Sequence, residues 1–182
     1  GIKIQYQQQK NPGGLPEAFI IGEKFIDKEN VALILGDNFF YGQSLTEKLR
    51  RCTKLKKGAK VFLYPVNNPS QYGIAEIKKN KITKIVEKPK KPFSNLAITG
   101  LYFFDNNVVK LSKTLKPSKR NEIEIVDLLK KYKNKNELSA EFIGRGAAWL
   151  DAGSIKDFYE ASSFVAAIEN RQGLKIGCLE EI

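Results

Sequence analysis

The chain has 182 residues, 42% of them hydrophobic and 28% charged, a balance that excludes a disordered tail, a collagen-like fibre and a disulfide scaffold. It contains no histidine, which excludes Ser-His triads, His-ligated zinc and histidine acid–base chemistry. The net charge of +11 comes mainly from dispersed lysines, typical of solvated surface residues, so we expect no nucleic-acid partner. No apolar run is long enough for a membrane span, and two cysteines without metal-binding spacing fit a cytoplasmic protein.

The first third of the chain alternates strand-like and helical patterns, which is typical of an α/β sheet. The continuous apolar run Val31–Leu35 predicts a strand buried on both faces of a parallel sheet. Ser44 with Glu47 predicts a capping box at the start of a helix. The elements expected in chain order are a strand over Lys3–Gln7, a turn at Asn11–Gly14, a helix over Leu15–Phe25, the strand Val31–Leu35, a helix over Ser44–Leu55 and a strand over Ala59–Val66.

The rest of the chain begins with an antiparallel hairpin. Alternating residues over Gly73–Ile77 and Lys81–Val86 flank a Lys-Asn-Lys turn. After it we expect strands over Leu96–Phe104 and Leu138–Ile143, and helices over Asn107–Leu115, Ile123–Tyr132 and Ile155–Asn170. There is no repeat and no clear linker, so the pattern predicts a single mixed α/β domain over residues 1–182.

Two aspartates stand at positions where an α/β sheet binds ligands, just beyond strand ends. Asp37 follows the strand Val31–Leu35, and Asp151 lies in a glycine-flanked loop with the only tryptophan. Taken singly, each also fits a structural role, as a turn residue or a helix cap. Taken together, two aspartates without nearby histidine or thiolate suit Mg²⁺, which binds one or two carboxylates together with phosphate oxygens and water.

A third candidate is the sequence Glu87-Lys88-Pro89 at the end of the hairpin. A glutamate can accept hydrogen bonds from sugar hydroxyls, and a neighbouring lysine can contact a phosphate. The same three residues are also common at strand ends that bind nothing.

The run Leu35-Gly36-Asp37-Asn38-Phe39-Phe40-Tyr41-Gly42 resembles the signature of glucose-1-phosphate thymidylyltransferases, the first enzymes of dTDP-rhamnose synthesis. The similarity covers essentially the whole chain in one order. Its further segments are Gln9–Ala18, Gln71–Gly73, Val86–Pro89, Thr99–Phe103, Arg145–Gly153 and Glu169–Lys175. The segment around Asp37 favours the thymidylyl branch over uridylyl and cytidylyl relatives.

The resemblance implies a Rossmann-like mixed sheet of the nucleotidyltransferase type, with dTTP and glucose 1-phosphate as substrates, Mg²⁺ as cofactor and a homotetramer as the assembly. It also implies the binding residues. They are Gln9 and Gly14 for the thymine base, Asp37 and Asp151 for Mg²⁺, Gly73, Glu87 and the backbone around Ile98 for glucose, and Lys88 for the sugar phosphate, with Tyr102 close by. Of these, Asp37, Asp151 and Lys88 are the expected catalytic residues.

The sequence also departs from the family pattern. Lys10, Gly13 and Val86 stand where the family commonly has Pro, Asp and Glu. The family's Gly-rich phosphate loop and its last helices have no counterpart, so we expect a domain incomplete at both ends, with impaired dTTP affinity and turnover. Two alternatives stay open: the same fold using UTP, and a non-catalytic module that binds a sugar nucleotide.

Overall fold

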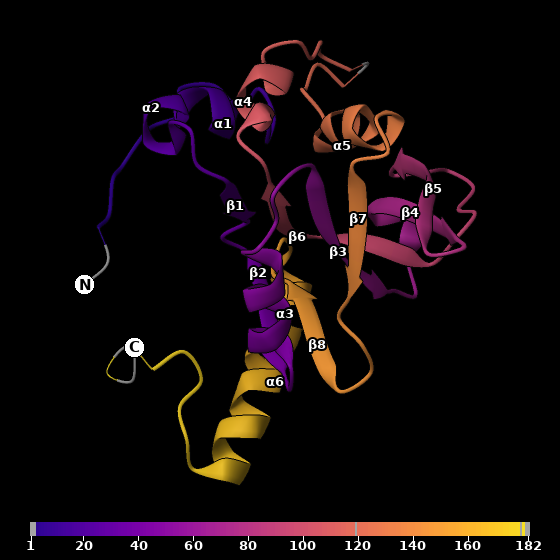
Figure 1. Ribbon diagram of the computed structural model, residues 1–182. Helices are drawn as coiled ribbons and strands as arrows, with labels where there is room; N and C mark the ends of the chain where they lie inside the picture. Colours follow the sequence, from indigo (N-terminus) through magenta and orange to yellow (C-terminus); the bar gives the residue numbers. More distant parts are fainter. Residues whose placement is uncertain (1–2, 119, 179, 181–182) are drawn as a thin grey trace.

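The computed structural model describes residues 3–118, 120–178 and 180, and shows a mixed sheet with helices against both faces (Figure 1). Within these residues six strands form the main sheet, in the order β5-β4-β6-β3-β7, with β1 paired to β6. Their bounds are β1 Val31–Ile34, β3 Ala59–Pro65, β4 Gly73–Lys78, β5 Lys81–Glu87, β6 Leu96–Phe104 and β7 Leu138–Phe142. The expected mixed α/β architecture is confirmed.

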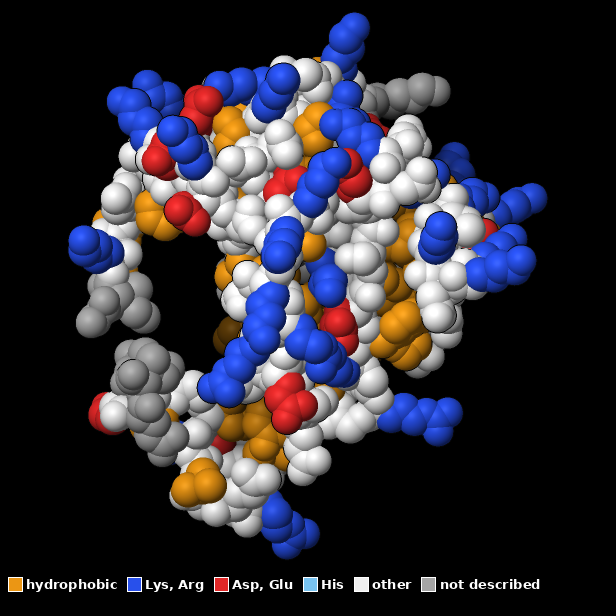
Figure 2. Space-filling view, in the orientation of Figure 1, with side chains coloured by type: hydrophobic (Ala, Val, Ile, Leu, Met, Phe, Trp, Pro, Cys, Tyr) orange, Lys and Arg blue, Asp and Glu red, His pale blue; other side chains and the backbone are white. Residues whose placement is uncertain are grey.

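Seven helical elements accompany the strands in the described part of the chain. They are α1 Glu17–Ile21, α2 Glu23–Ile26, α3 Leu45–Cys52, the 3₁₀ turn η1 Pro69–Gln71, α4 Asn107–Ser112, α5 Ile125–Asn134 and α6 Ile155–Gln172. None of these helices is long and apolar enough to cross a bilayer. Lysine and arginine side chains are spread over the face drawn in Figure 2 and are interspersed with acidic ones, as the sequence predicts.

Strand β6 is the centre of the fold because it pairs with β1, β3 and β4 and carries side chains into two cores. Successive residues of a strand point to opposite faces of its sheet. Accordingly, Phe104 packs with Phe19 and Tyr132 on one face, and Phe103 packs with Phe62 on the other. The expected bounds of this strand are confirmed.

Strand β1 forms where expected, but the prediction of a parallel environment buried on both faces is wrong. It pairs antiparallel with β6, with Val31 opposite Phe104, and only β3 and β7 pair in parallel in the described residues. Val31 and Leu33 are partly buried, whereas Ile34 is 58% exposed. A short apolar run indicates a strand, but it does not specify the direction of the neighbouring strand.

Three other local predictions need correction. Lys3–Gln7 takes no strand pairing in the described residues. The helix expected over Leu15–Phe25 is divided into α1 and α2 at Gly22, in keeping with the poor helix propensity of glycine. Ser44 is the N-cap residue of α3, but its backbone is left-handed and its side chain makes no capping hydrogen bond, so the predicted capping box with Glu47 is absent.

The hairpin β4–β5 is confirmed, and its register places Gly73 opposite Glu87. Its turn residues Lys79 and Asn80 both have positive φ, at 49° and 60°. Positive φ at both central residues is what a type I′ two-residue hairpin turn requires, and the twist of that turn matches the twist of the strands.

A second, two-stranded sheet was not predicted. Strands β2 (Asn38–Gly42) and β8 (Ala147–Asp151) pair antiparallel, and their register sets Asn38 opposite Asp151. This pairing joins two segments far apart in the sequence. It places both candidate metal aspartates, Asp37 and Asp151, at one end of this two-stranded unit, the β2–β8 ribbon. Helix α6 follows β8 after a short turn and packs against the β2–β8 ribbon, where Phe164 contacts Phe39 and Tyr41 of β2.

Gly42→Ala is expected to lower the free energy of unfolding by about 1–3 kcal/mol, because the site is overpacked. Gly42 has a φ of 145°, and a Cβ there would overlap Ala147 in the opposite strand. Urea unfolding measures the loss, with Gly146→Ala as control, since a Cβ at Gly146 meets nothing within 4 Å. Equal stability of both variants would contradict a close β2–β8 approach.

Candidate functional site

A cleft of about 170 Å³ lies where β5, β6 and the β2–β8 ribbon meet. It brings together every predicted site residue except Gln9 and Gly14. The predicted residues that line it are Asp37, Gly73, Glu87, Lys88, Ile98, Tyr102 and Asp151. Residues from distant segments therefore form one site at this end of the sheet.

The acidic end of the cleft is built by Asp37 and Asp151. The backbone N–H of Ala152 donates to the Asp37 carbonyl at 2.8 Å, which fixes the two chain segments against each other. A Cβ placed on Gly153 would lie 3.0 Å from Asp151 Oδ1 and 3.8 Å from Asp37 Oδ2. The two carboxylates thus border the same small space, which the absence of a side chain on Gly153 leaves open.

The electrostatics at this end favour a cation. Burial raises the pKa of Asp151, and the charge of Asp37 raises it further, although the Gly153 N–H acts in the opposite direction. Among the described residues no group of three or more His, Cys, Asp or Glu side chains could hold a metal. Two carboxylates do fit Mg²⁺, since this ion completes its coordination with phosphate oxygens and water.

The other end of the cleft is built by the hairpin. A Cβ on Gly73 would lie 3.0 Å from Glu87 Oε2, so the lack of a side chain at Gly73 leaves room for this carboxylate. Burial and the neighbouring Glu124 raise the pKa of Glu87, while Lys88 and Arg120 lower it. A partly buried carboxylate of this kind can accept hydrogen bonds from hydroxyl groups of a bound sugar.

Lys88 and Tyr102 line the cleft between these two ends. Lys88 has an exposed side chain and a positive φ of 39°, and its N–H donates to the Tyr72 carbonyl at 3.0 Å. Tyr102 is 4% exposed, and burial together with Glu87 raises its pKa, which keeps the hydroxyl protonated. Ile98 is also buried and contributes an apolar wall.

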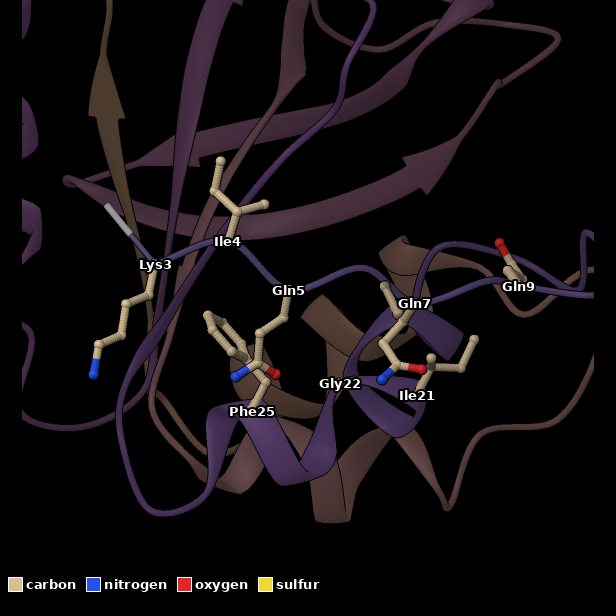
Figure 3. Close-up of a pocket in the computed structure, with 9 residues that line it drawn as sticks. Lys3, Ile4, Gln5, Gln7, Gln9, Ile21, Gly22 and Phe25 are labelled. Carbon is tan, nitrogen blue, oxygen red and sulfur yellow. The ribbon is translucent and has the colours of Figure 1, made fainter. Parts of the chain in front are cut away.

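Gln9 and Gly14 lie outside this cleft but close to each other. Gln9 Nε2 donates to the Gly14 carbonyl at 3.3 Å and to Glu17 Oε2 at 2.5 Å. Gln9 borders a separate hollow of about 420 Å³ between the N-terminal segment and α1–α2 (Figure 3). Gly14 directly precedes Leu15, which does line the cleft. The φ of Gly14 is 118°, and its close approach to the Ile123 backbone leaves no room for a side chain.

Comparison with known proteins identifies the fold and the family. The family model described as nucleotidyl transferase matches residues 1–168. The chain belongs to this family.

Among solved structures, the chain is similar to a putative glucose-1-phosphate thymidylyltransferase from Bacillus anthracis in complex with a sucrose. The TM-score is 0.79 at 36% identity, and the match covers 88% of this chain and 64% of that one. A UDP-glucose pyrophosphorylase complexed with UDP-glucose gives a TM-score of 0.78 at 27% identity, covering 92% of this chain and 66% of that one.

Several curated relatives of this nucleotidyl transferase share a name. The glucose-1-phosphate thymidylyltransferase of Neisseria meningitidis serogroup A is 50% identical over 183 residues, which cover 100% of this chain and 64% of the relative. The enzyme of the same name from Xanthomonas campestris pv. campestris is 46% identical and is covered to 62%, again with 100% of this chain. The chain therefore spans less than two thirds of the length of these relatives.

Three cleft residues of this nucleotidyl transferase, and one residue beside the cleft, were missed as functional candidates. Tyr72, Asn38 and Trp149 line the cleft, and Arg120 lies 3.9 Å from Glu87. Asn38 could have been found from its place beside Asp37. Arg120 follows no pattern in the sequence, because it stands in an irregular segment before α5.

Wild type is expected to lose stability as the pH rises, and Glu87→Gln is expected to lose less. Burial raises the folded-state pKa of Glu87 above its ordinary value of 4.5. The stability that protonated Glu87 contributes is therefore fully present below the ordinary pKa and is lost as the pH rises through the raised pKa. Urea unfolding at about pH 4 and about pH 8 measures the difference, and the variant should lose less stability than wild type. Glu122→Gln is the matched control, since Glu122 also contacts Arg120 but is 44% exposed. The same pH response in both variants would contradict the assignment to buried Glu87.

Proposed function

We propose that this chain transfers a thymidylyl group from dTTP to glucose 1-phosphate, giving dTDP-glucose and pyrophosphate. The observation that carries the proposal is the cleft, which has two facing aspartates at one end and a partly buried glutamate at the other, with a lysine between them. The relatives that are 40–50% identical bear the name of this reaction. The related UDP-glucose pyrophosphorylase supports the same reaction class.

In the proposed reaction a phosphate oxygen of glucose 1-phosphate attacks the α-phosphorus of dTTP. The bond between that phosphorus and the oxygen bridging to the β-phosphate breaks, and pyrophosphate leaves with the electron pair. Such a displacement needs positioning and charge stabilisation rather than a protein nucleophile. A cleft without histidine is compatible with it.

Each cleft residue has a defined part in this proposal. Glu87 accepts hydrogen bonds from glucose hydroxyls beside Gly73, and Lys88 attracts the sugar phosphate. Asp37 and Asp151 would hold Mg²⁺, which would supply positive charge to neutralise the phosphates. Gln9 and Gly14 contact the thymine base in this scheme.

The setting of the reaction is also part of the proposal. Cys52 and Cys178 are both free, which fits a reducing cytoplasm. The product dTDP-glucose is the precursor that the resemblance places at the start of dTDP-rhamnose synthesis. We further propose a homo-oligomer, the homotetramer that the resemblance implies.

The test is release of pyrophosphate by the purified chain from glucose 1-phosphate with dTTP or with UTP. Faster release with dTTP supports the proposal, and preference for UTP replaces it with the uridylyl reaction. Calorimetric titration with dTDP-glucose is run in parallel. Binding without turnover indicates a non-catalytic sugar-nucleotide module. If a folded chain shows no binding and no turnover, the proposal is wrong.

A further inference from the structure

The side-chain amide of Asn38 connects three segments of the cleft wall. Its Oδ1 accepts hydrogen bonds from the backbone N–H of Gly100 at 2.9 Å and from Trp149 Nε1 at 2.6 Å. Its Nδ2 donates to Asp37 Oδ1 at 2.8 Å. The backbone of Asn38 lies opposite Asp151 in the β2–β8 ribbon.

These contacts permit only one orientation of the amide. Both groups that face Oδ1 are N–H donors, so a rotated amide would set its own NH₂ against two donors. The approach of β6 is close, since a Cβ on Gly100 would lie 2.5 Å from Oδ1. With the oxygen held by Gly100 and Trp149, the NH₂ group must face Asp37.

The orientation of Asn38 determines which oxygen of Asp37 is available. Oδ1 of Asp37 is occupied by the Asn38 amide, whereas Oδ2 is the oxygen nearest Gly153, on the side of Asp151 Oδ1. Asp37 is exposed, and without this hydrogen bond its carboxylate would rotate about a broad terminal torsion. The amide therefore holds the free oxygen toward its acidic partner.

We propose that Asn38 is a positioning residue, which fixes the carboxylate of Asp37 so that its free oxygen and Asp151 bind one divalent cation together. This inference rests on the proposed function, because that function assigns the cation to these two aspartates. Groups that orient a metal ligand typically change metal affinity about 10–100-fold when they are removed.

The test is Mn²⁺ binding, followed by the electron paramagnetic resonance signal of the free ion, which requires no turnover. Asn38→Leu is similar in size and neutral, so it removes the hydrogen bonds without adding charge. We expect it to weaken Mn²⁺ binding about 10-fold or more, and Asp37→Ala to weaken it further. The matched control is Asn107→Leu, which removes an Asn-to-Asp hydrogen bond of 3.2 Å to Asp105, outside the cleft, and should leave the affinity unchanged.

The outcomes separate this inference from the proposed function. If wild type binds Mn²⁺ no better than Asp37→Ala, the metal site of the proposed function is wrong, and the role of Asn38 fails with it. If Asp37→Ala loses the ion but folded Asn38→Leu keeps wild-type affinity, only the positioning role is overturned.

A second measurement covers the case in which Asn38→Leu does not fold, since Gly100 and Trp149 would both lose their acceptor. In nuclear magnetic resonance spectra of Asp37→Ala, the side-chain amide protons of Asn38 should shift because their acceptor is gone. The Gly100 amide and Trp149 indole protons should keep their positions. Unchanged Asn38 side-chain resonances would overturn the inference.

Discussion

Replacing Asp37 or Asp151 with alanine is expected to reduce the proposed thymidylyl transfer about 10²- to 10³-fold, the usual loss when one charge-stabilising group is removed. In the proposed site each variant would leave one carboxylate for the cation, which would then neutralise the phosphates poorly. The fold should persist, because the hydrogen bond that joins Asp37 to Ala152, directly after β8, is made by backbone groups and survives the substitution. Initial rates of pyrophosphate release at saturating Mg²⁺ measure the loss, and thermal unfolding checks the fold.

Asp127→Ala is the matched control for these two variants. Asp127 lies on α5, where its carboxylate is 39% exposed and pairs with Lys130 at 2.8 Å. A surface pair of this kind contributes little to stability, so both rate and stability should stay near wild type. Wild-type rates in Asp37→Ala would contradict the role of the acidic pair, whereas a slow control would indicate a general effect of removing charge.

The part of the site that follows from local sequence was predictable. The hairpin β4–β5 is defined by alternation and a short polar turn, and its register brings Gly73 opposite Glu87 without any distant information. Asp37 stands at a strand end for the same local reason. These residues depend on contacts between neighbours in the sequence, which patterns of hydrophobicity record.

The pairing of β2 with β8 could not be predicted in this way. Each strand has five residues, and most strands of the main sheet lie between them in the sequence. Two short strands of mixed composition do not reveal their partner or register. The meeting of Asp37 with Asp151 therefore had to be inferred from chemistry, and the central place of Asn38 was missed, because its bonds to Gly100 and Trp149 exist only in the folded chain.

A buried acidic residue away from the cleft was missed for the same reason. Asp105 directly follows β6 and is 3% exposed. It accepts hydrogen bonds from the Gly58 N–H, the Tyr132 hydroxyl and both nitrogen donors of Asn107, at 2.7 to 3.2 Å. The sequence pattern indicates only that Asp105 is a polar residue after a strand. In the fold it joins the start of β3, the start of α4 and helix α5.

Asp105→Ala is expected to lower the free energy of unfolding by about 3–5 kcal/mol. The substitution leaves buried donors on Gly58 and Tyr132 without an acceptor, and each such group costs about 1–3 kcal/mol. A loss of this size is a large part of the roughly 5–15 kcal/mol that stabilises a typical domain. Urea unfolding followed by circular dichroism measures it.

Tyr132→Phe separates the hydrogen bond from the rest of the cluster. It removes one donor and leaves Asp105 its three other bonds, so it should cost about 1.5–3 kcal/mol, clearly less than Asp105→Ala. Because Asp105 does not line the cleft, Mn²⁺ affinity of Asp105→Ala, measured where the variant is still folded, should equal that of wild type. A weakened Mn²⁺ affinity in folded Asp105→Ala would show that the hydrogen-bond cluster of Asp105 and the acidic pair are coupled through β6. Equal free energies of unfolding for Asp105→Ala and Tyr132→Phe would show that the other three hydrogen bonds contribute little.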